Sequence, residues 1–242
     1  MVKRRSATVR NLLLASLPKA DSDRLMSGLE IVPLVLKTLL HKPGEPIDFV
    51  YFPGGGFCSI VTVLEDGSMV EVATVGREGV LGLSAVAGVT PTPAAAMVQG
   101  ATDTCYRMTA EAFRREMDRR GPFYELMTRY SQALTGQIMQ STACNAVHTI
   151  EQRLARWLLM ARDRMEADEF PLTQEFAAMM LGATRPTVTI VAGTLQRQGL
   201  ITYRRGVVRI LDGRRLEAAS CECYRATTNL LRRVTAERPS PR

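Results

Sequence analysis

Histidine is scarce in this sequence, and aromatic residues are few as well. Two histidines, one tryptophan and 6% aromatic residues occur among 242 positions. Neither His41 nor His148 has an acid–base or nucleophile constellation around it in the sequence, so we expect no enzyme and no catalytic residue. For both histidines we favour a hydrogen-bonding role over ligation of haem.

Cysteine is also sparse, and its distribution predicts a reducing environment. The five cysteines are odd in number and scattered, which indicates the cytoplasm and not a disulfide framework. Cys221-x-Cys223 is either a thiol pair or half of a metal site. Because no histidine or second cysteine pair lies beside it in sequence, we favour a packed helix start and expect no metal and no cofactor.

Long apolar runs and phosphate-binding loops are missing as well. No run of about 18 apolar residues occurs, so we expect no membrane span. The apolar patch over residues 12–17 is short and charged residues follow it at once, so we do not expect a signal peptide. Gly54 to Gly56 are not followed by a helix start, which argues against nucleoside triphosphate binding.

Positive charge is present in excess and is concentrated in the second half of the chain. The net charge is +7. Residues 149–242 carry 16 arginines, no lysine and 10 acidic residues, whereas residues 1–148 carry 15 basic and 14 acidic residues. Arginine suits bidentate contacts to phosphate or guanine, although a codon preference for arginine also explains this bias.

The stretch from Leu172 to Ile201 predicts two short helices joined by a glycine turn. Thr173 is a suitable N-cap for the first helix, and Gly182 supplies a left-handed residue at its end. Thr184 caps the second helix, and Gly199 closes it. An ordinary helical hairpin remains the alternative, because this pattern often arises by accident.

The second helix has an inward apolar side and an outward side that suits a DNA major groove. Val188, Val191, Ala192 and Leu195 recur at helical spacing. The following TYRRGVVRIL resembles the wing of a winged helix, with two arginines at the hairpin tip for phosphate contact. The residues predicted to bind DNA are Thr173, Thr184, Arg185, Pro186, Thr187, Thr189, Ile190, Arg197, Arg204 and Arg205.

Upstream of this stretch the pattern changes from strands to helices. Short β-type runs separated by turns extend from Ile31 to about Met108 and predict a jelly roll; they cover residues 34–40, 48–52, 59–64, 68–75 and 96–108. A helix over residues 123–147 then places polar and apolar residues near a coiled-coil spacing, which favours pairing with a second subunit through Leu126, Tyr130, Ala133, Gln137 and Cys144. Burial within one subunit is the alternative.

This order of elements resembles the CRP/FNR family, the relatives of the cyclic-AMP receptor protein. The strings KPGEP, VGREGVLGL, HTIEQRLARWLLMARD, LGATRPTVT and LEAASCECY strengthen the resemblance, which covers nearly the whole chain. It implies an α+β fold with an N-terminal double-stranded β-roll like a cyclic-nucleotide-binding domain, a long dimerisation helix and a C-terminal winged helix-turn-helix. The expected ranges are 1–120, 121–148 and 149–229, with a basic tail over 230–242.

The resemblance implies a homodimeric transcription regulator that binds a pseudo-palindromic operator in double-stranded DNA. Arg185 matches the family's recognition helix, whereas Pro186 replaces an acid and Ile190 replaces a second base-reading arginine. RNA polymerase is a further candidate partner and the effector is unknown. The alternative is a small-ligand sensor or protein-interaction module in which DNA binding is secondary.

The expected effector pocket departs from that of the cyclic-AMP-binding relatives. Val80 stands where they have the glutamate that holds the ribose, and Pro93 and Ala94 stand near their phosphate-binding Arg-Ser pair. Without that arginine a buried phosphate lacks a charge partner. Residues 1–57 also lack the cysteines of the family's iron–sulfur sensors. We expect no cyclic-AMP binding in the usual manner, and either a closed pocket or another ligand at Gly76, Gly79, Val80, Leu81, Gly82, Pro93 and Ala94.

Overall fold

The N-terminal half is a roll of two antiparallel sheets. The structure is a computed structural model that describes residues 9–87 and 92–236. Two short helices, α1 (Leu12–Ser16) and α2 (Lys19–Ser27), precede the roll. One sheet has the order β1-β7-β3, from β1 (Glu30–Leu34), β7 (Thr102–Thr109) and β3 (Phe49–Pro53). The other has the order β2-β6-β4-β5, from β2 (Leu39–His41), β6 (Ala94–Gly100), β4 (Phe57–Val63) and β5 (Met69–Val75).

Two of the predicted strands were wrong in their extent. The run over residues 34–40 contains the end of β1, a turn and the start of β2, with Lys37 at a φ of 66°. Its apolar residues did not mark a buried strand, because Val35 is 60% exposed. The run over residues 96–108 is divided into β6 and β7 at Ala101. The roll that we expected is nevertheless present.

Three helices connect the roll to the C-terminal half. After the 3₁₀ helix η1 (Leu83–Ala87), β6 and β7, the chain forms α3 (Ala110–Asp118), α4 (Pro122–Val147) and α5 (Ile150–Met165). Pro122 opens α4, where its missing N–H costs nothing. Thr149 and Gln152 form a capping box at the start of α5. The break between α4 and α5 is therefore encoded locally.

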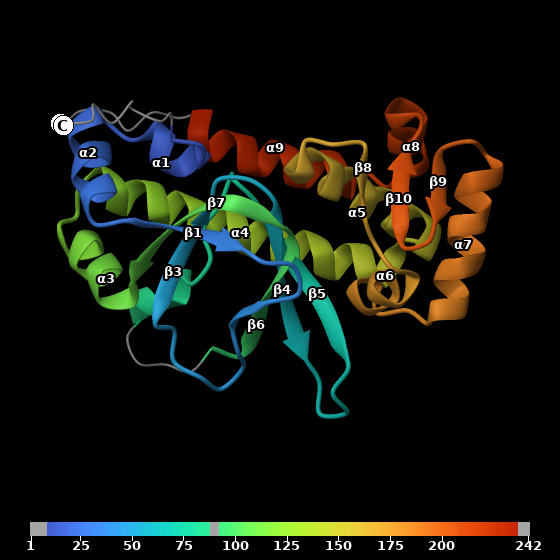
Figure 1. The fold of residues 1–242 in the computed structure, drawn as a ribbon, viewed down its shortest axis with the longest axis horizontal. Helices are drawn as coiled ribbons and strands as arrows, with labels where there is room; N and C mark the ends of the chain where they lie inside the picture. Colours follow the sequence, from blue (N-terminus) through green and yellow to red (C-terminus); the bar gives the residue numbers. More distant parts are fainter. Residues whose placement is uncertain (1–8, 88–91, 237–242) are drawn as a thin grey trace.

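The C-terminal half has the predicted winged helix-turn-helix and then a helix that returns along α4. It comprises β8 (Glu169–Pro171), α6 (Gln174–Leu181), α7 (Arg185–Arg197), β9 (Ile201–Arg204), β10 (Val207–Ile210), α8 (Gly213–Ala219) and α9 (Cys223–Ala236). Strands β8, β10 and β9 form one small sheet. Figure 1 shows α9 lying beside α4 over the roll.

Helix α9 occupies part of the range that we expected to be a basic tail. Residues 230–236 are helical, and Leu231 and Val234 are buried against the roll-side core. Leucine and valine at a spacing of three residues form an apolar side that α4 covers, so this segment is not a free tail. Residues 237–242 lie outside the described residues, as do residues 1–8 of the expected N-terminal tail.

Two large apolar clusters hold the fold together. One joins the roll to α3, α4 and α9. The other fills the winged helix, and it continues into the roll through Phe57, Val61 and Ala95. Among the described residues, no helix is long and apolar enough to cross a membrane.

Candidate nucleic-acid interface

The turn between α6 and α7 forms as its sequence predicts. The Thr173 hydroxyl accepts a hydrogen bond from the Phe176 amide at 3.2 Å, which caps α6. Gly182 ends α6 in the left-handed conformation at a φ of 56°. The Thr184 hydroxyl then accepts from the Thr187 amide at the start of α7. These caps fix where α7 begins.

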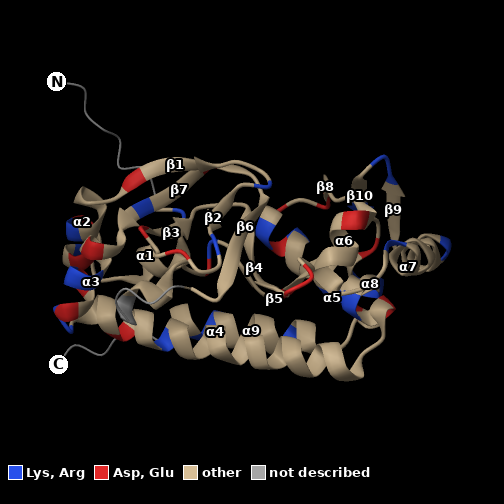
Figure 2. Cartoon of the chain, turned by 90° about the horizontal axis from the view of Figure 1, so that it is seen from below, with Lys and Arg blue, Asp and Glu red and all other residues tan. Residues whose placement is uncertain are grey.

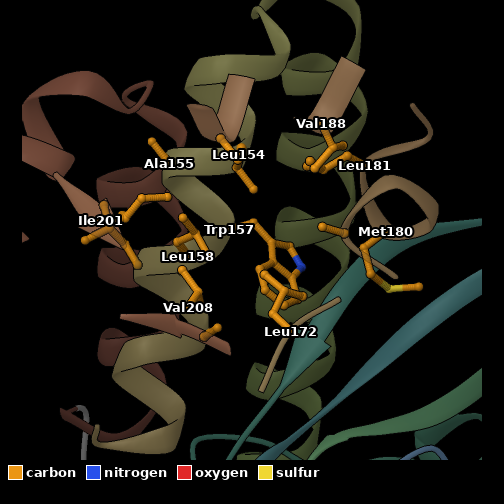
Figure 3. Packing of buried hydrophobic residues seen from close by; sticks show 14 of the residues in the cluster. Leu154, Ala155, Trp157, Leu158, Leu172, Met180, Leu181, Val188, Ile201 and Val208 are labelled. Carbon is orange, nitrogen blue, oxygen red and sulfur yellow. The ribbon is translucent and has the colours of Figure 1, made fainter. Parts of the chain in front are cut away.

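Helix α7 has one side in the core and one side in solvent. Val188, Ala192 and Leu195 are fully buried and Val191 is partly buried. Figure 3 shows Val188 beside Leu181, within the cluster that also contains Leu154. On the opposite side, Ile190 is 68% exposed although it is a large apolar residue. Helix α7 therefore presents Ile190 together with the polar residues of its outer side to solvent.

The polar residues of α7 differ in whether their side chains already form hydrogen bonds within the chain. Arg185 and Pro186 are exposed. Thr184 and Thr187 share a hydroxyl–hydroxyl hydrogen bond of 2.8 Å. Thr189 donates its hydroxyl to the Gln174 carboxamide oxygen at 2.6 Å. Arg185 therefore remains the most available polar group of this turn, whereas Arg197, at the far end, donates to Thr194.

The wing presents two arginines at its tip. Arg204 pairs with Val207 across a two-residue turn, in which Arg205 and Gly206 have φ angles of 50° and 75°. Such a turn matches the twist of a β-hairpin. Arg204 and Arg205 are both exposed, and neither makes an ion pair with any residue that the structure describes. Figure 2 shows positive charge at this turn and on α7.

A polar hollow of about 430 Å³ lies between the start of α6, the start of α7 and the wing. Arg185 and Arg205 contribute to its wall, as do Gln174, Glu175 and Tyr203, which the sequence analysis did not single out. Gln174 could have been found from the sequence, because it directly follows the Thr173 cap and so begins α6. Burial raises the pKa of Tyr203, so its phenol stays neutral. The hollow thus brings together arginines from two elements.

The five residues that we predicted to line a dimer interface are buried within the subunit. Leu126, Tyr130 and Ala133 pack in the core between α4 and the roll, and each is at most 3% exposed. Gln137 donates to the Thr74 carbonyl at 3.1 Å, and Cys144 lies against Cys221. This prediction was wrong because the most apolar stripe of α4 packs against the rest of its own chain.

The glycines of the expected effector pocket allow two helices to approach the roll. A Cβ atom on Gly79 would lie 2.3 Å from the Tyr130 hydroxyl of α4, and one on Gly76 would lie 2.8 Å from Arg164 Cγ of α5. Gly82 has a φ of 87°. Packing and backbone conformation therefore account for these glycines without a ligand.

The neighbouring residues Val80 and Leu81 face different sides, and the last two predicted pocket residues lie at the start of β6. Val80 and Leu81 are buried in different apolar clusters. Pro93 is exposed, and Ala94 begins β6, where it pairs with Thr62 of β4.

Two buried polar links join the winged helix to the roll. Trp157 of α5 donates its indole N–H to the Glu71 carboxylate of β5 at 3.1 Å, and Ser59 donates to the same carboxylate. Burial raises the pKa of Glu71, and these hydrogen bonds oppose the shift. Arg164 of α5 pairs with Glu78 at 2.7 Å, and both side chains are at least four-fifths buried. Helix α5, which is part of the core of the winged helix, is thus docked against the roll.

An apolar hollow of about 170 Å³ lies along this junction. Phe57, Trp157, Met165 and Phe176 contribute to its wall. Its walls come from both the roll and the winged helix, so its volume depends on how the two halves dock.

Two family models match the chain in the expected order. Residues 34–120 match the cyclic nucleotide-binding domain, and residues 152–219 match the Crp-like helix-turn-helix domain. Together these ranges cover more than half of the chain. A β-roll of the cyclic-nucleotide-binding type, a long helix and a winged helix-turn-helix define a class of two-domain transcription regulators.

Solved structures of the same architecture cover most of the chain. A crp/fnr-family regulator from Eubacterium rectale is 20% identical with a TM-score of 0.67, over 86% of this chain and 96% of that one. A CRP-family regulator from Thermus thermophilus is 21% identical with a TM-score of 0.64, over 78% and 95%. The c-di-GMP-responsive global regulator CLP of Xanthomonas campestris is 16% identical with a TM-score of 0.63, over 81% and 100%.

These identities show a shared fold, and a search of curated proteins returned no match. The chain belongs to the CRP/FNR family of transcription regulators, and its C-terminal half is a DNA-binding helix-turn-helix.

Proposed function

We propose that this regulator reads an operator through the exposed side of α7 while the wing holds the DNA backbone. The observation that carries the proposal is the exposed pair Arg185 and Ile190 on a helix whose other side is locked in the core. An arginine side chain can donate two hydrogen bonds to the O6 and N7 atoms of guanine, and an apolar side chain can contact the thymine methyl group. Arg204 and Arg205 lie on the separate wing, where phosphate contact is the role that suits them.

We propose that two copies act together, so that the operator is pseudo-palindromic. The side of α4 opposite the roll carries six exposed residues at alternating spacings of four and three: Thr128, Gln132, Thr135, Met139, Thr142 and Ala146. Residues 130–147 contain no charged side chain. Figure 2 shows the roll and winged helix on one side of α4 and α9. Heptad spacing without charge suits a second copy of the same helix.

The proposed regulator acts in the cytoplasm, with the roll over residues 1–120 as its sensor and the reader over 149–229. Half-sites one helical turn apart, about 34 to 36 Å, follow from this dimeric arrangement. RNA polymerase is a further proposed partner for the assembled dimer.

The first test separates base reading from backbone contact. After selection of preferred DNA from a random pool, Arg185→Ala is expected to lose about 1 to 3 kcal/mol per half-site on the selected sequence, because one bidentate contact is removed. Its affinity for unrelated DNA should change little. Arg204→Ala should weaken both kinds of DNA alike and flatten the salt dependence by about one unit per subunit. Fluorescence anisotropy at several salt concentrations measures both effects.

A matched control is Arg232→Ala, because Arg232 is an exposed arginine on α9, away from the wing. It should bind DNA like the unaltered protein. If the unaltered protein shows no footprint and no salt-dependent affinity for any DNA, the proposal fails and a role confined to ligand or protein binding takes its place.

We also propose that the roll does not bind cyclic AMP in the family's usual manner. Val80 is fully buried among apolar residues, so the ribose-binding carboxylate has no counterpart there. Isothermal titration with cyclic AMP should give no binding at micromolar concentrations. Because the Xanthomonas neighbour responds to c-di-GMP, that nucleotide belongs in a parallel titration. Micromolar affinity for cyclic AMP would overturn this part of the proposal.

A further inference from the structure

A cluster of metal-binding side chains lies where the end of α4 meets the start of α9. It consists of Cys144, His148, Cys221 and Cys223, whose ligand atoms all lie within 4.8 Å of one another. The Cys144 and Cys221 sulfurs are 3.5 Å apart, and Cys223 Sγ is 3.6 Å from His148 Nδ1. These separations are close to the roughly 3.5 to 3.8 Å between neighbouring ligands of a tetrahedral zinc ion.

The fold gathers two pairs that lie far apart in the sequence. Cys144 and His148 are four residues apart at the end of α4, which places them on the same side of the helix. Cys221 and Cys223 flank the start of α9, which runs back along α4. The three cysteine side chains are buried and unpaired by disulfides, and the His148 side chain is 13% exposed.

Neighbouring groups orient the histidine and one sulfur. Glu222 contacts His148 Nε2 at 3.2 Å, which leaves Nδ1 facing the sulfurs. Gln140 donates its amide N–H to Cys223 Sγ at 3.0 Å. A carboxylate on the outer nitrogen of a histidine, with an N–H donor to a thiolate, is the usual outer shell of a zinc site.

Two buried arginines lie beside the cluster and favour thiolates there. Arg153 and Arg156 are 7% and 5% exposed, and both interact electrostatically with Cys144. Neither forms an ion pair with another residue in the described part of the chain. Three thiolates and one divalent cation carry a net charge of −1, which offsets part of this positive charge, and the buried Glu71 carboxylate also interacts with Arg156.

We propose that Cys144, His148, Cys221 and Cys223 bind one structural Zn²⁺. Thiolate and imidazole donors select zinc over magnesium or calcium, and four protein ligands close the site to catalysis. An iron–sulfur cluster would hold ligands of different irons farther apart than the 4.8 Å within which all four ligand atoms lie here. On binding, the three thiols release their protons to solvent. The ion ties α9 to the joint between α4 and α5.

Metal content and cobalt spectroscopy test this site. The full chain, purified under reducing conditions, should contain about one zinc per chain by mass spectrometry. Cys223→Ser and Cys144→Ser should lose most of it, whereas Cys58→Ser, at a buried cysteine of β4 in the roll, should keep it. Because a serine variant can fail to fold, Co²⁺ is also titrated into metal-free, reduced, unaltered protein. Tetrahedral thiolate coordination should then appear as charge-transfer and visible absorption bands.

A milder variant probes the outer shell without removing a ligand. Glu222→Gln should keep the cobalt spectrum but weaken zinc about 10- to 100-fold in competition with a chromogenic chelator. The proposal is overturned if the reduced protein gives no thiolate–cobalt bands, or if zinc loss is equal in Cys58→Ser. A Cys144–Cys221 disulfide that forms in air in a chain without metal, two mass units lighter, would identify a redox pair instead.

Discussion

Arg164→Ala is expected to lower the free energy of unfolding by about 3 to 5 kcal/mol, because it leaves a buried carboxylate without its partner. Arg164 and Glu78 are 2.7 Å apart with side chains 8% and 18% exposed. The same guanidinium also donates to the Met160 carbonyl. Urea denaturation followed by circular dichroism measures the loss. Emission from Trp157, the single tryptophan, reports separately whether the junction with the roll has opened.

Two further variants distinguish the ion pair from general disruption. Arg162→Ala removes a neighbouring arginine whose ion pair with Asp168 is partly exposed, so it should cost at most about 1 kcal/mol. Combining Arg164→Met with Glu78→Gln removes both charges and should recover much of the stability. If Arg164→Ala is as mild as Arg162→Ala, the pair does not hold the two halves together.

The helix-turn-helix was predictable because its boundaries depend on local chemistry. Threonine caps at Thr173 and Thr184 and a left-handed residue at Gly182 act within a few residues of themselves. The wing is equally local, since Arg205 and Gly206 form its turn. For the roll, only the general pattern was predictable. The apolar run at residues 34–40 crosses a turn, and strand pairing at long range decides where such a run breaks.

The proposed dimer-forming side of α4 could not be assigned from the spacing of its residues alone. It carries two stripes at heptad spacing, one through Leu126 and Tyr130 and the other through Thr135 and Met139. The apolar stripe is the more obvious dimer seam, yet the subunit's own roll covers it. Only the three-dimensional structure shows that the polar, uncharged stripe is the exposed one.

The cysteine cluster was missed for a related reason. The spacing of Cys144 and His148 matches one turn of helix, and Cys221-x-Cys223 is a recognisable half-site. Nothing in the sequence pattern says that α9 returns antiparallel to α4 and brings the two pairs together. The cluster therefore becomes visible only once the packing of α9 against α4 is known.

Met139→Glu is expected to convert the proposed dimer to a monomer. Met139 is 68% exposed at the middle of the polar stripe of α4. A two-fold axis would place both new carboxylates in one interface, and each buried ion costs several kcal/mol. We expect dimerisation to weaken at least about 100-fold, which corresponds to about 2.8 kcal/mol. Sedimentation equilibrium over a range of concentrations measures this change.

Val35→Glu is the matched control, because Val35 is an apolar residue of similar exposure in a turn of the roll. It should leave the dimer intact, and Met139→Leu should do the same. The monomeric variant should also lose the advantage of a two-half-site operator over a single half-site, because the two readers are no longer joined. If the Met139→Glu protein sediments as a dimer, the subunit interface lies on another surface. The exposed stripe of α4 would then not explain a pseudo-palindromic operator.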